Sequence, residues 1–452
     1  MNDHTAIFVR TRFAPSPTGV LHIGGLRTAL FNYLYAKKYG GECVLRIDDT
    51  DTLRSKKEYE VDILDSLQLA GITFDATYHQ SERHEIYRSY LITLIETNQA
   101  YLSKEEDSDG KRSEVIRFKN PNKVITFDDT IRGTISVDTT DLGDFVIAKS
   151  IDEPLYHLAS VIDDFEMGIT HVIRGEEHIS NTPRQILIQE SINAPRPQYA
   201  HLPLILATDR SKLSKRHGAV STTEYIREGF LPGALVNYIA LLGWSPQVKG
   251  GADASDILSI DTLTTQFDLT DMQKGGAVFT IEKLKSINQH YIKELPPVVL
   301  AEKIRHWLPE NYSSKISDEY LNKLAPIILE RIATFGELSE LFTAGEFDYY
   351  LTPPAYQKEL LLGKKGELDP THTKEHLQEL RGRIERIGEW TMEGIRTAVW
   401  DYAEEKGKAA VLWPLRVSLS GKERSTDPFT IAYIVGKEAT LGRIKTAMML
   451  LA

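Results

Sequence analysis

The first seventy residues alternate short apolar runs with stretches of helical period, and this order limits the fold more than any other feature of the sequence. An extended run ends near Phe13, and the turn after it, residues 14–19, contains prolines that donate no backbone hydrogen bond and so end the strand. Helical spacing over residues 26–34 leads to a second apolar run, residues 42–47, and then to a helical stretch over residues 56–69. This alternation predicts an α/β fold with a doubly wound sheet.

Between residues 80 and 152 the order of predicted helices and strands differs from this alternation, which returns after residue 155. We predict a helix capped by Ser81, followed by short strands over residues 114–118, 133–137 and 144–149. We interpret this part as an insertion. The α/β pattern resumes over residues 156–162, 171–174, 182–191 and 202–207. Beyond residue 219 the period is almost entirely helical, with proline and glycine at 296–297 and 363–370 as candidate boundaries.

Charge and cysteine content restrict the kinds of site that the chain can hold. The 53 Lys and Arg residues against 64 Asp and Glu residues give a net charge of −11, which alone disfavours a nucleic-acid partner, although a basic stripe can lie on an acidic protein. The single cysteine, Cys43, excludes a disulfide within the chain and any site that needs two thiolates. We find neither an apolar run near the roughly 18 residues of a membrane span nor a signal-peptide pattern, and we therefore expect a cytoplasmic protein with no membrane partner.

The turn between the first strand and the first helix carries the first group of candidate binding residues. Gly24 and Gly25 follow closely after His22, and the absence of Cβ atoms lets a planar base or a phosphate approach the backbone. Free N–H groups at the start of the next helix favour an anion, and His22 can add a donor to a phosphate oxygen in a transition state. Such a turn is also common as a purely structural feature.

A basic segment over residues 209–218, with the sequence DRSKLSKRHG, is the second candidate. Lys212, Leu213, Ser214 and Lys215 lie at its centre. Lysine offers three donors as a point charge, so a loop of this composition can close over a polyphosphate and follow a leaving diphosphate. A solvated surface loop would have the same composition.

The two segments together resemble the two signature motifs of class I aminoacyl-tRNA synthetases, in the order found in that family. Further motifs narrow the resemblance to bacterial-type glutamyl-tRNA synthetases, and they cover essentially the whole chain. In chain order these are RFAPSPTG at 12–19, LRIDDTD at 45–51, QSER at 80–83, YHLA at 156–159, IRGEE at 173–177, GFLP at 229–232, the segment 279–292, PLR at 414–416 and GKE at 436–438.

The resemblance implies a reaction in two steps. ATP and L-glutamate would form glutamyl-adenylate and diphosphate, and the glutamyl group would then pass to the terminal adenosine of glutamate tRNA, with glutamine tRNA left open as a further acceptor. The first step needs alignment of the carboxylate with the α-phosphorus and neutralisation of the developing charge. The resemblance assigns this stabilisation to His22, Lys212 and Lys215, with Mg²⁺ bridging phosphate oxygens. The ATP-binding residues that it implies are His22, Gly24, Gly25, Lys212, Leu213, Ser214 and Lys215.

The resemblance also implies a pocket for glutamate. By this resemblance Arg12 would hold the γ-carboxylate and Arg174 would take the second such position. Guanidinium groups suit these roles, since they bind carboxylates through two parallel hydrogen bonds. Asp48 would face the α-ammonium group. The full set is Arg12, Ala14, Ser16, Asp48, Tyr156 and Arg174. Without the resemblance, the two arginines would equally fit ion pairs at strand ends and Tyr156 a core position.

Three positions depart from the family pattern. Asp48 replaces a glutamate that is common in bacterial relatives, so its carboxylate is one methylene shorter. Ser160 stands where some relatives carry asparagine. Residues 102–104, Leu-Ser-Lys, replace the cysteines by which many relatives bind zinc, and with Cys43 alone in the chain we expect no structural zinc and no protein metal site.

The architecture implied by the resemblance is a class I Rossmann-type catalytic core with an α+β acceptor-binding insertion, followed by an all-α C-terminal anticodon-binding region. The expected segments are the core at 1–79 and 153–218, the insertion at 80–152, a helical stem-contact domain at 219–295, and the two anticodon-binding parts at 296–370 and 371–452. Arg331 is a candidate anticodon contact, although surface arginines on helices usually serve solubility. Monomer is the expected state.

Two other functions stay open at this point. A catalytically silent, tRNA-binding homologue would be free to lose His22, the lysines and the two arginines, all of which are present. A Rossmann nucleotidyltransferase making a small cofactor would share the first turn but would not need residues 296–452. The helical period of that last part disfavours glutaminyl-tRNA synthetase, whose anticodon domain is a β-barrel, and its length disfavours the truncated paralogue that glutamylates a modified base.

Overall fold

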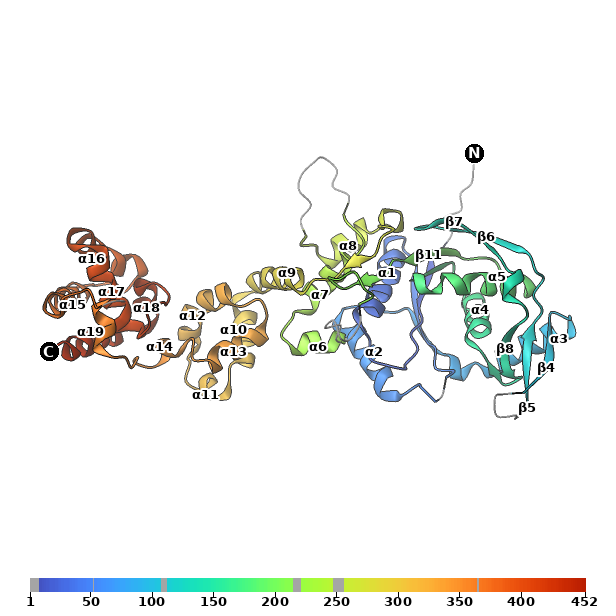
Figure 1. Cartoon of the computed structure of the whole chain (residues 1–452), viewed down its shortest axis with the longest axis horizontal. Coiled ribbons are helices and arrows are strands. Elements are labelled where there is room, and N and C mark those ends of the chain that lie inside the picture. Colours follow the sequence, from blue (N-terminus) through green and yellow to red (C-terminus); the bar gives the residue numbers. More distant parts are fainter. Residues whose placement is uncertain (1–7, 52, 107–111, 214–220, 247–255, 364–365) are drawn as a thin grey trace. The chain divides into compact units, whose positions relative to one another are not determined.

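The longer strands all lie in the first part of the chain, coloured blue to green in Figure 1, and the central ones form two sheets. In this computed structural model, β1 (Arg10–Phe13), β2 (Glu42–Ile47) and β3 (Ala76–His79) are parallel and lie in that order. The helices α1 (Ile23–Lys38) and α2 (Lys57–Leu69) connect them, which confirms the predicted order of strand, turn and helix. β2 is buried from Cys43 to Ile47, as its apolar run predicts. The described residues are 8–51, 53–106, 112–213, 221–246, 256–363 and 366–452.

The second sheet has the order β10-β11-β6-β7. β10 (His171–Gly175) and β11 (Gln198–Leu202) are parallel, and the hairpin of β6 (Val124–Asp129) and β7 (Gly133–Asp138) joins β11 where Tyr199 pairs with Asp129. The Thr170 N–H donates to the Arg10 carbonyl at 2.9 Å and links this sheet to β1. The segment read as an insertion therefore contributes strands to the core sheet.

The rest of the insertion is an antiparallel sheet with a helix beside it. The sheet has the order β4 (Ala100–Glu106), β5 (Arg112–Phe118), β8 (Phe145–Ser150) and β9 (Glu153–Pro154). The predicted cap at Ser81 is wrong: residues Gln80–Glu82 form the 3₁₀ turn η1, and α3 (His84–Glu96) begins after it. Instead, the Ser81 hydroxyl and N–H donate to the Asp49 carboxylate at 2.7 and 2.8 Å.

The remaining elements complete the first compact unit, residues 1–291. α4 (Tyr156–Glu166) and α5 (Thr182–Ser191) pack against each other, and the 3₁₀ segment η3 (Glu176–Asn181) leads into α5. The other elements are β12 (Ile205–Leu206), α6 (Thr222–Arg227), α7 (Pro232–Ala240), α8 (Ile260–Gln266), β13 (Ala277–Val278) and α9 (Ile281–Lys293), which ends just beyond the unit.

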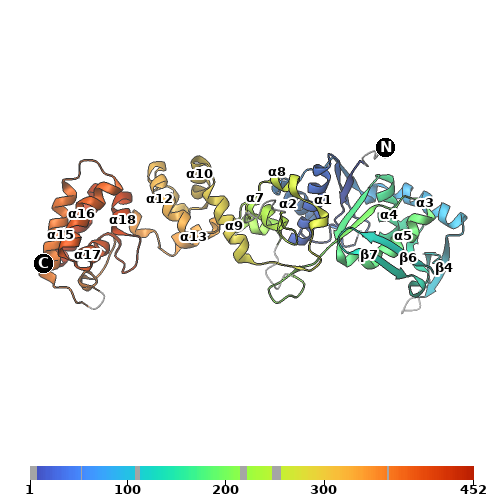
Figure 2. The same cartoon turned by 90° about the horizontal axis from the view of Figure 1, so that it is seen from above.

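The second compact unit, residues 292–452, contains only helices and turns in the part that the structure describes (Figure 2). Its helices are α10 (Pro297–Trp307), α11 (Glu310–Ser313), α12 (Asp318–Arg331), α13 (Phe335–Thr343), α14 (Asp348–Leu351), α15 (Pro370–Glu385), α16 (Met392–Lys406), α17 (Lys408–Ser420), α18 (Pro428–Val435) and α19 (Lys437–Leu450). Over the described ranges, none of the helices in either unit combines the length and apolar character that a membrane span requires.

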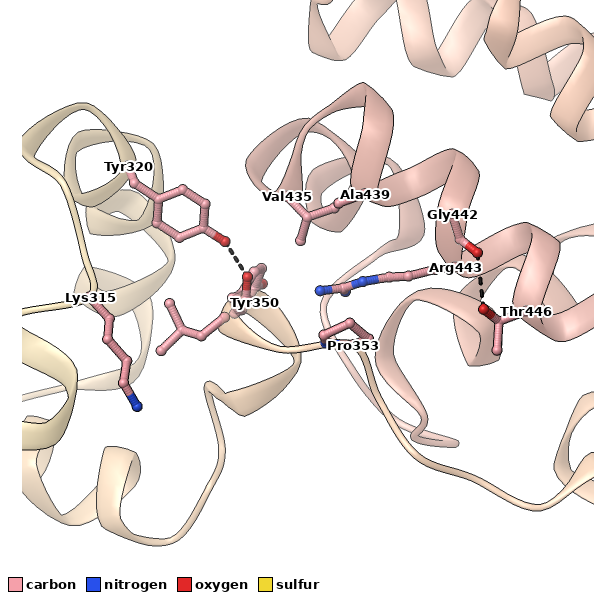
Figure 3. A pocket seen from close by; sticks show the side chains of 10 residues that line it. Lys315, Tyr320, Tyr350, Pro353, Val435, Ala439, Gly442, Arg443 and Thr446 are labelled. Carbon is pink, nitrogen blue, oxygen red and sulfur yellow. Dashed lines mark hydrogen bonds between the residues drawn. The ribbon is translucent and has the colours of Figure 1, made fainter.

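A buried arginine ties several helices of this second unit together. Arg443 on α19 donates from Nη1 to the carbonyls of Tyr349 and Leu419 at 2.6 and 2.7 Å, and it lines a cavity of about 460 Å³ (Figure 3). On another wall of the cavity the Tyr320 hydroxyl donates to the Tyr350 carbonyl. Carbonyl oxygens thus accept hydrogen bonds from Nη1 and Nη2 of Arg443 within the fold, whereas its buried Nε has no hydrogen-bond partner among the described residues.

Candidate active site

A small cavity of about 230 Å³ lies where β1, β2 and β10 meet the start of α4. It is lined by all the residues expected to bind glutamate: Arg12, Ala14, Ser16, Asp48, Tyr156 and Arg174. The side chains come from segments far apart in the sequence, and the ends of parallel strands bring them together. The structure therefore joins these residues at one cavity, while their binding roles stay predictions.

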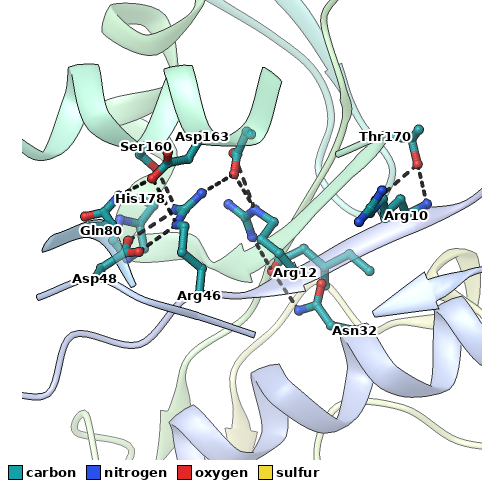
Figure 4. Close-up of polar contacts among 12 residues, drawn as sticks. Arg10, Arg12, Asn32, Arg46, Asp48, Gln80, Ser160, Asp163, Thr170 and His178 are labelled. Atoms are coloured by element: carbon teal, nitrogen blue, oxygen red, sulfur yellow. Dashed lines mark hydrogen bonds and ion pairs between the residues drawn. The ribbon is translucent and has the colours of Figure 1, made fainter. Parts of the chain in front are cut away.

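Arg46 organises one wall of this cavity from a fully buried position. Its Nε and Nη2 donate to the two carboxylate oxygens of Asp48 at 2.6 and 3.2 Å, and its Nη1 donates to Asp164 Oδ1 at 2.7 Å. Nη2 also donates to the Ser160 hydroxyl at 3.2 Å. Figure 4 shows Arg46 and Arg12 side by side, reaching from their strands toward the helix that carries Ser160 and Asp163. Asp48 is thus held by a cation of the protein itself.

A third buried acid, Asp163, connects Arg46 to the start of the insertion. Asp163 has no exposed surface, and it lies 3.7 Å from Arg46 Nε. Its carboxylate accepts hydrogen bonds from the Gln80 amide, the Arg83 guanidinium and the Tyr87 hydroxyl at 2.7 to 2.8 Å. Because a buried carboxylate is costly unless it is paired and hydrogen-bonded, this network fixes η1 and α3 against α4.

The two arginines expected to bind carboxylates differ in their partners. Arg12 Nε donates to Asp164 Oδ1 at 3.2 Å, so part of its charge is balanced within the protein. Arg174 Nη2 donates to the Thr182 hydroxyl at 2.8 Å, and no carboxylate of the described residues forms an ion pair with it. Burial lowers the pKa of Arg174. A buried guanidinium without a carboxylate partner favours an anionic ligand in this cavity.

The two carboxylates that accept hydrogen bonds from Arg46, those of Asp48 and Asp164, respond to burial in different ways. Burial raises the pKa of Asp48 to about 6, and the Arg46 cation opposes this rise. For Asp164, burial also favours the neutral form, but Arg12 and Arg46 outweigh it and lower the pKa. Asp164 therefore stays an anion that orients Arg12 and Arg46, while burial leaves Asp48 with a pKa of about 6.

A larger cavity of about 720 Å³ lies at the start of α1. It is lined by the described residues of the predicted ATP site: His22, Gly24, Gly25, Lys212 and Leu213. Ser214 and Lys215, the rest of that prediction, lie outside the described residues. The Thr222 N–H donates to the Leu21 carbonyl at 3.0 Å, so the chain after the basic segment returns to the same turn.

His22 is the N-cap of α1. Its Nδ1 accepts a hydrogen bond from the Gly25 N–H at 3.1 Å, which leaves Nε2 as the donor of the neutral ring. Burial lowers the pKa of His22, nearby Lys212 lowers it further, and Glu177 opposes both. A Cβ at Gly24 would lie 3.1 Å from the imidazole, so glycine leaves room for the ring.

The two cavities adjoin each other. Gly25, Thr28, Gly175 and Glu177 line both of them. The Glu177 carboxylate folds over Gly175, where a Cβ would come within 2.2 Å of a carboxylate oxygen. A ligand in the small cavity and a ligand in the large cavity can therefore meet over these four residues, which is the arrangement needed to join an acid to a nucleotide phosphate.

Several lining residues were not predicted from the sequence. The sequence could have indicated Arg46, because a charged residue inside an apolar run that forms a buried strand is rare unless it is paired with an opposite charge. Glu177 and His178 lie in or beside a recognised motif without a role assigned to them, and they line the small cavity. Arg27, buried on α1 with donors to the Leu242 and Pro203 carbonyls, lines the large one, and burial lowers its pKa to about 10.

Arg331, the candidate anticodon contact, lies in the second unit at the end of α12. Its Nη2 donates to the Thr426 hydroxyl at 3.1 Å, and its guanidinium stands 5.3 Å from the centre of the Phe347 ring. These contacts give Arg331 a role inside the helical unit. Its contact with an anticodon stays a prediction.

Comparisons with known proteins agree with this architecture. The family model described as tRNA synthetases class I (E and Q), catalytic domain, matches residues 8–109 and 102–286, and the model described as Anticodon binding domain matches residues 299–448. A glutamate–tRNA ligase of Aquifex aeolicus is 45% identical over 366 residues, covering 73% of this chain and 76% of that protein. Glutamate–tRNA ligase 1 of Caldanaerobacter subterraneus is 37% identical, covering 97% of each chain.

Solved structures give the same result. The crystal structure of a glutamate tRNA ligase from Elizabethkingia meningosepticum in complex with its amino acid has a TM-score of 0.87 and 33% identity, covering 98% of this chain and all of that one. Glutamate–tRNA synthetase from Elizabethkingia anophelis has a TM-score of 0.84 and 32% identity over the same share of this chain. Fold, adjoining cavities and family models define a class I tRNA synthetase with a helical anticodon-binding domain. Within that class, the chain belongs to the glutamate–tRNA ligase family.

Proposed function

We propose that this chain activates L-glutamate with ATP and transfers it to the terminal adenosine of glutamate tRNA. The small cavity binds glutamate through Arg12, Arg174 and Asp48, with Ala14, Ser16 and Tyr156 completing its wall. The large cavity binds ATP over Gly24 and Gly25. His22, Lys212 and Lys215 stabilise the charge that develops on the phosphates.

The observation that carries this proposal is the shared boundary of the two cavities at Gly25, Thr28, Gly175 and Glu177. Glutamate bound through its side chain in the cationic cavity would direct its α-carboxylate toward a nucleotide on the other side of that boundary. Bringing the two reactants together in this way replaces a bimolecular encounter by an oriented one. His22, Lys212 and Lys215 would then donate hydrogen bonds to the phosphate oxygens on which negative charge develops.

Mg²⁺ enters this proposal as part of the nucleotide substrate. Over the described parts of the chain, no three His, Cys, Asp or Glu side chains form a group that could hold a metal ion. The phosphate oxygens would supply most of the ligands, which suits a small cation that keeps several waters. The lysines of the basic segment would share the neutralisation of the diphosphate.

The family assignment also leads us to propose the partners and setting of the chain. The helical unit would read the anticodon, and the insertion at 80–152 would hold the acceptor end of the tRNA. One chain lines both cavities, so a monomer would suffice for activity. The cytoplasm, where tRNA is charged for protein synthesis, is the proposed location.

Aminoacylation with radiolabelled glutamate tests the proposal directly. Purified transcripts of glutamate tRNA and glutamine tRNA are assayed in parallel. ATP–diphosphate exchange is measured with glutamate and, for comparison, with glutamine. We expect glutamate-dependent exchange in the presence of tRNA and charging of glutamate tRNA, and charging of the second transcript would add glutamine tRNA as a substrate. Binding of tRNA without charging of either transcript would instead favour a silent homologue.

A further inference from the structure

A buried histidine stands directly behind Arg174. His201 on β11 has no exposed surface, and its Nε2 lies 3.2 Å from Arg174 Nε. On the other side of the ring, Nδ1 lies 2.6 Å from Asp129 Oδ2, and the same oxygen accepts the His201 N–H at 3.0 Å. None of these contacts was expected from the sequence, because the three residues lie on β6, β10 and β11.

The hydrogen bonds fix which nitrogen of His201 carries the proton. Arginine has N–H donors only, so His201 Nε2 must accept from Arg174 Nε. The proton of the neutral ring is therefore on Nδ1, and it is donated to Asp129. Thr182 fits the same scheme, because its hydroxyl oxygen accepts from Arg174 Nη2 and its own proton faces two acceptors, the His178 carbonyl at 3.2 Å and His201 Nε2 at 3.3 Å.

The surroundings of Asp129 keep it an anion. Its other carboxylate oxygen accepts the N–H groups of Ile131 and Arg132 at 3.0 and 2.8 Å. Burial raises the pKa of Asp129, but the His201 ring and these backbone donors outweigh burial, and the pKa lies below its ordinary value. Burial lowers the pKa of His201, which keeps the ring neutral. The unprotonated Nε2 of His201 thus faces Arg174 as an acceptor, whereas a charged ring would present a second N–H donor there.

We propose that Asp129 and His201 form a positioning pair for Arg174, holding its Nε so that the remaining donors of the guanidinium face the carboxylate of the amino-acid substrate. The inference rests on the proposed function, in which Arg174 binds that carboxylate. Two of the five N–H groups of Arg174 are used by His201 and Thr182. The guanidinium is thereby locked before the ligand arrives, which is the condition for orienting a planar carboxylate.

Two substitutions of His201 separate positioning from simple packing. His201→Gln can offer its amide oxygen near the place of Nε2 and so keep an acceptor for Arg174, while it loses the bond to Asp129. His201→Asn can offer its amide N–H near the place of Nδ1 and so keep the bond to Asp129, while it loses the acceptor. A purely structural role would favour the Asn variant, because that variant satisfies the buried carboxylate.

The test measures KM for glutamate, KM for ATP and the melting temperature of each variant, with glutamate tRNA present. We expect His201→Asn to raise KM for glutamate at least about 10-fold, the effect of losing one hydrogen bond to a charged group, with KM for ATP unchanged. His201→Gln is expected to stay closer to the wild type. Equal KM values for glutamate in the two variants, or a parallel rise in KM for ATP, would overturn the proposal.

Two controls distinguish the failure of this inference from the failure of the proposed function. A wild-type chain without glutamate-dependent activity would contradict the proposed function itself. An Arg174→Ala variant with unchanged KM for glutamate would show that Arg174 does not bind the substrate, so that His201 and Asp129 would have no binding group to position. If His201→Asn does not fold, Asp129→Asn replaces it, because an amide donor toward Nδ1 moves the ring proton to Nε2. A folded Asp129→Asn variant with wild-type KM for glutamate would then contradict the proposal.

Discussion

At the scale of single residues, Arg12 is the simplest test of the small cavity. Its Nε is paired with Asp164, and it lines the wall together with Arg174. Arg12→Ala should raise KM for glutamate at least about 10-fold, because a charged hydrogen-bond donor to the substrate is lost, and should leave KM for ATP within about 2-fold. Arg10→Ala is the matched control, since Arg10 lies on the same strand and pairs with Glu42 at 3.3 Å. Equal changes in both KM values would indicate misfolding instead.

Asp48 gives the cavity a pH dependence of defined sign. Because burial raises its pKa to about 6, the carboxylate is ionised at pH 7.5 and becomes largely neutral at pH 5. Glutamate itself stays mostly ionised over this range, since its side chain titrates near 4.3 and is only about one-sixth protonated at pH 5. Attraction for the α-ammonium group should therefore weaken as the pH falls, and KM for glutamate should rise about 10-fold between pH 7.5 and 5.

The control for this pH profile is Asp48→Asn, which removes the charge at every pH. Its KM for glutamate should be high at pH 7.5 and should change little down to pH 5. An Asn variant that kept the wild-type slope would assign the titration to another group.

At the scale of elements, His22 at the start of α1 combines a structural role with the catalytic role that we propose for it. Nδ1 caps the Gly25 N–H, whereas Nε2 is the donor proposed for the phosphates. Asparagine is among the best N-caps, so His22→Asn should keep the melting temperature within about 2 °C, while His22→Ala should lose about 1 kcal/mol of stability. Both variants should slow adenylate formation at least about 100-fold. Rapid-quench kinetics would contradict the assignment if the Asn variant kept the wild-type rate.

The elements also show what the sequence can and cannot reveal. β2 was predictable from its run of apolar residues, and α1 from apolar residues at helical spacing, because both patterns lie within the element itself. Ser81 was misread because its hydroxyl binds Asp49, a residue far away in the sequence, instead of the first turn of α3. The same limit applies to the small cavity. Motifs in the sequence pointed to Arg12 and Arg174, but Asp129 and His201 come together only because β6 pairs with β11 in the fold.

At the scale of the whole molecule, the division into residues 1–291 and 292–452 predicts two calorimetric transitions, because each unit has its own core. Both proposed substrate cavities lie in the first unit. Glutamate with a non-hydrolysable ATP analogue, each near 100 times its Kd, should stabilise that unit by at least about 2.7 kcal/mol and raise only one transition. At the same ligand concentrations, a 10-fold weaker Kd for glutamate in the Arg12→Ala variant should lower the contribution of glutamate from about 2.7 to about 1.4 kcal/mol, which assigns the transition. A single transition that moves as a whole would show that the helical unit unfolds together with the catalytic one.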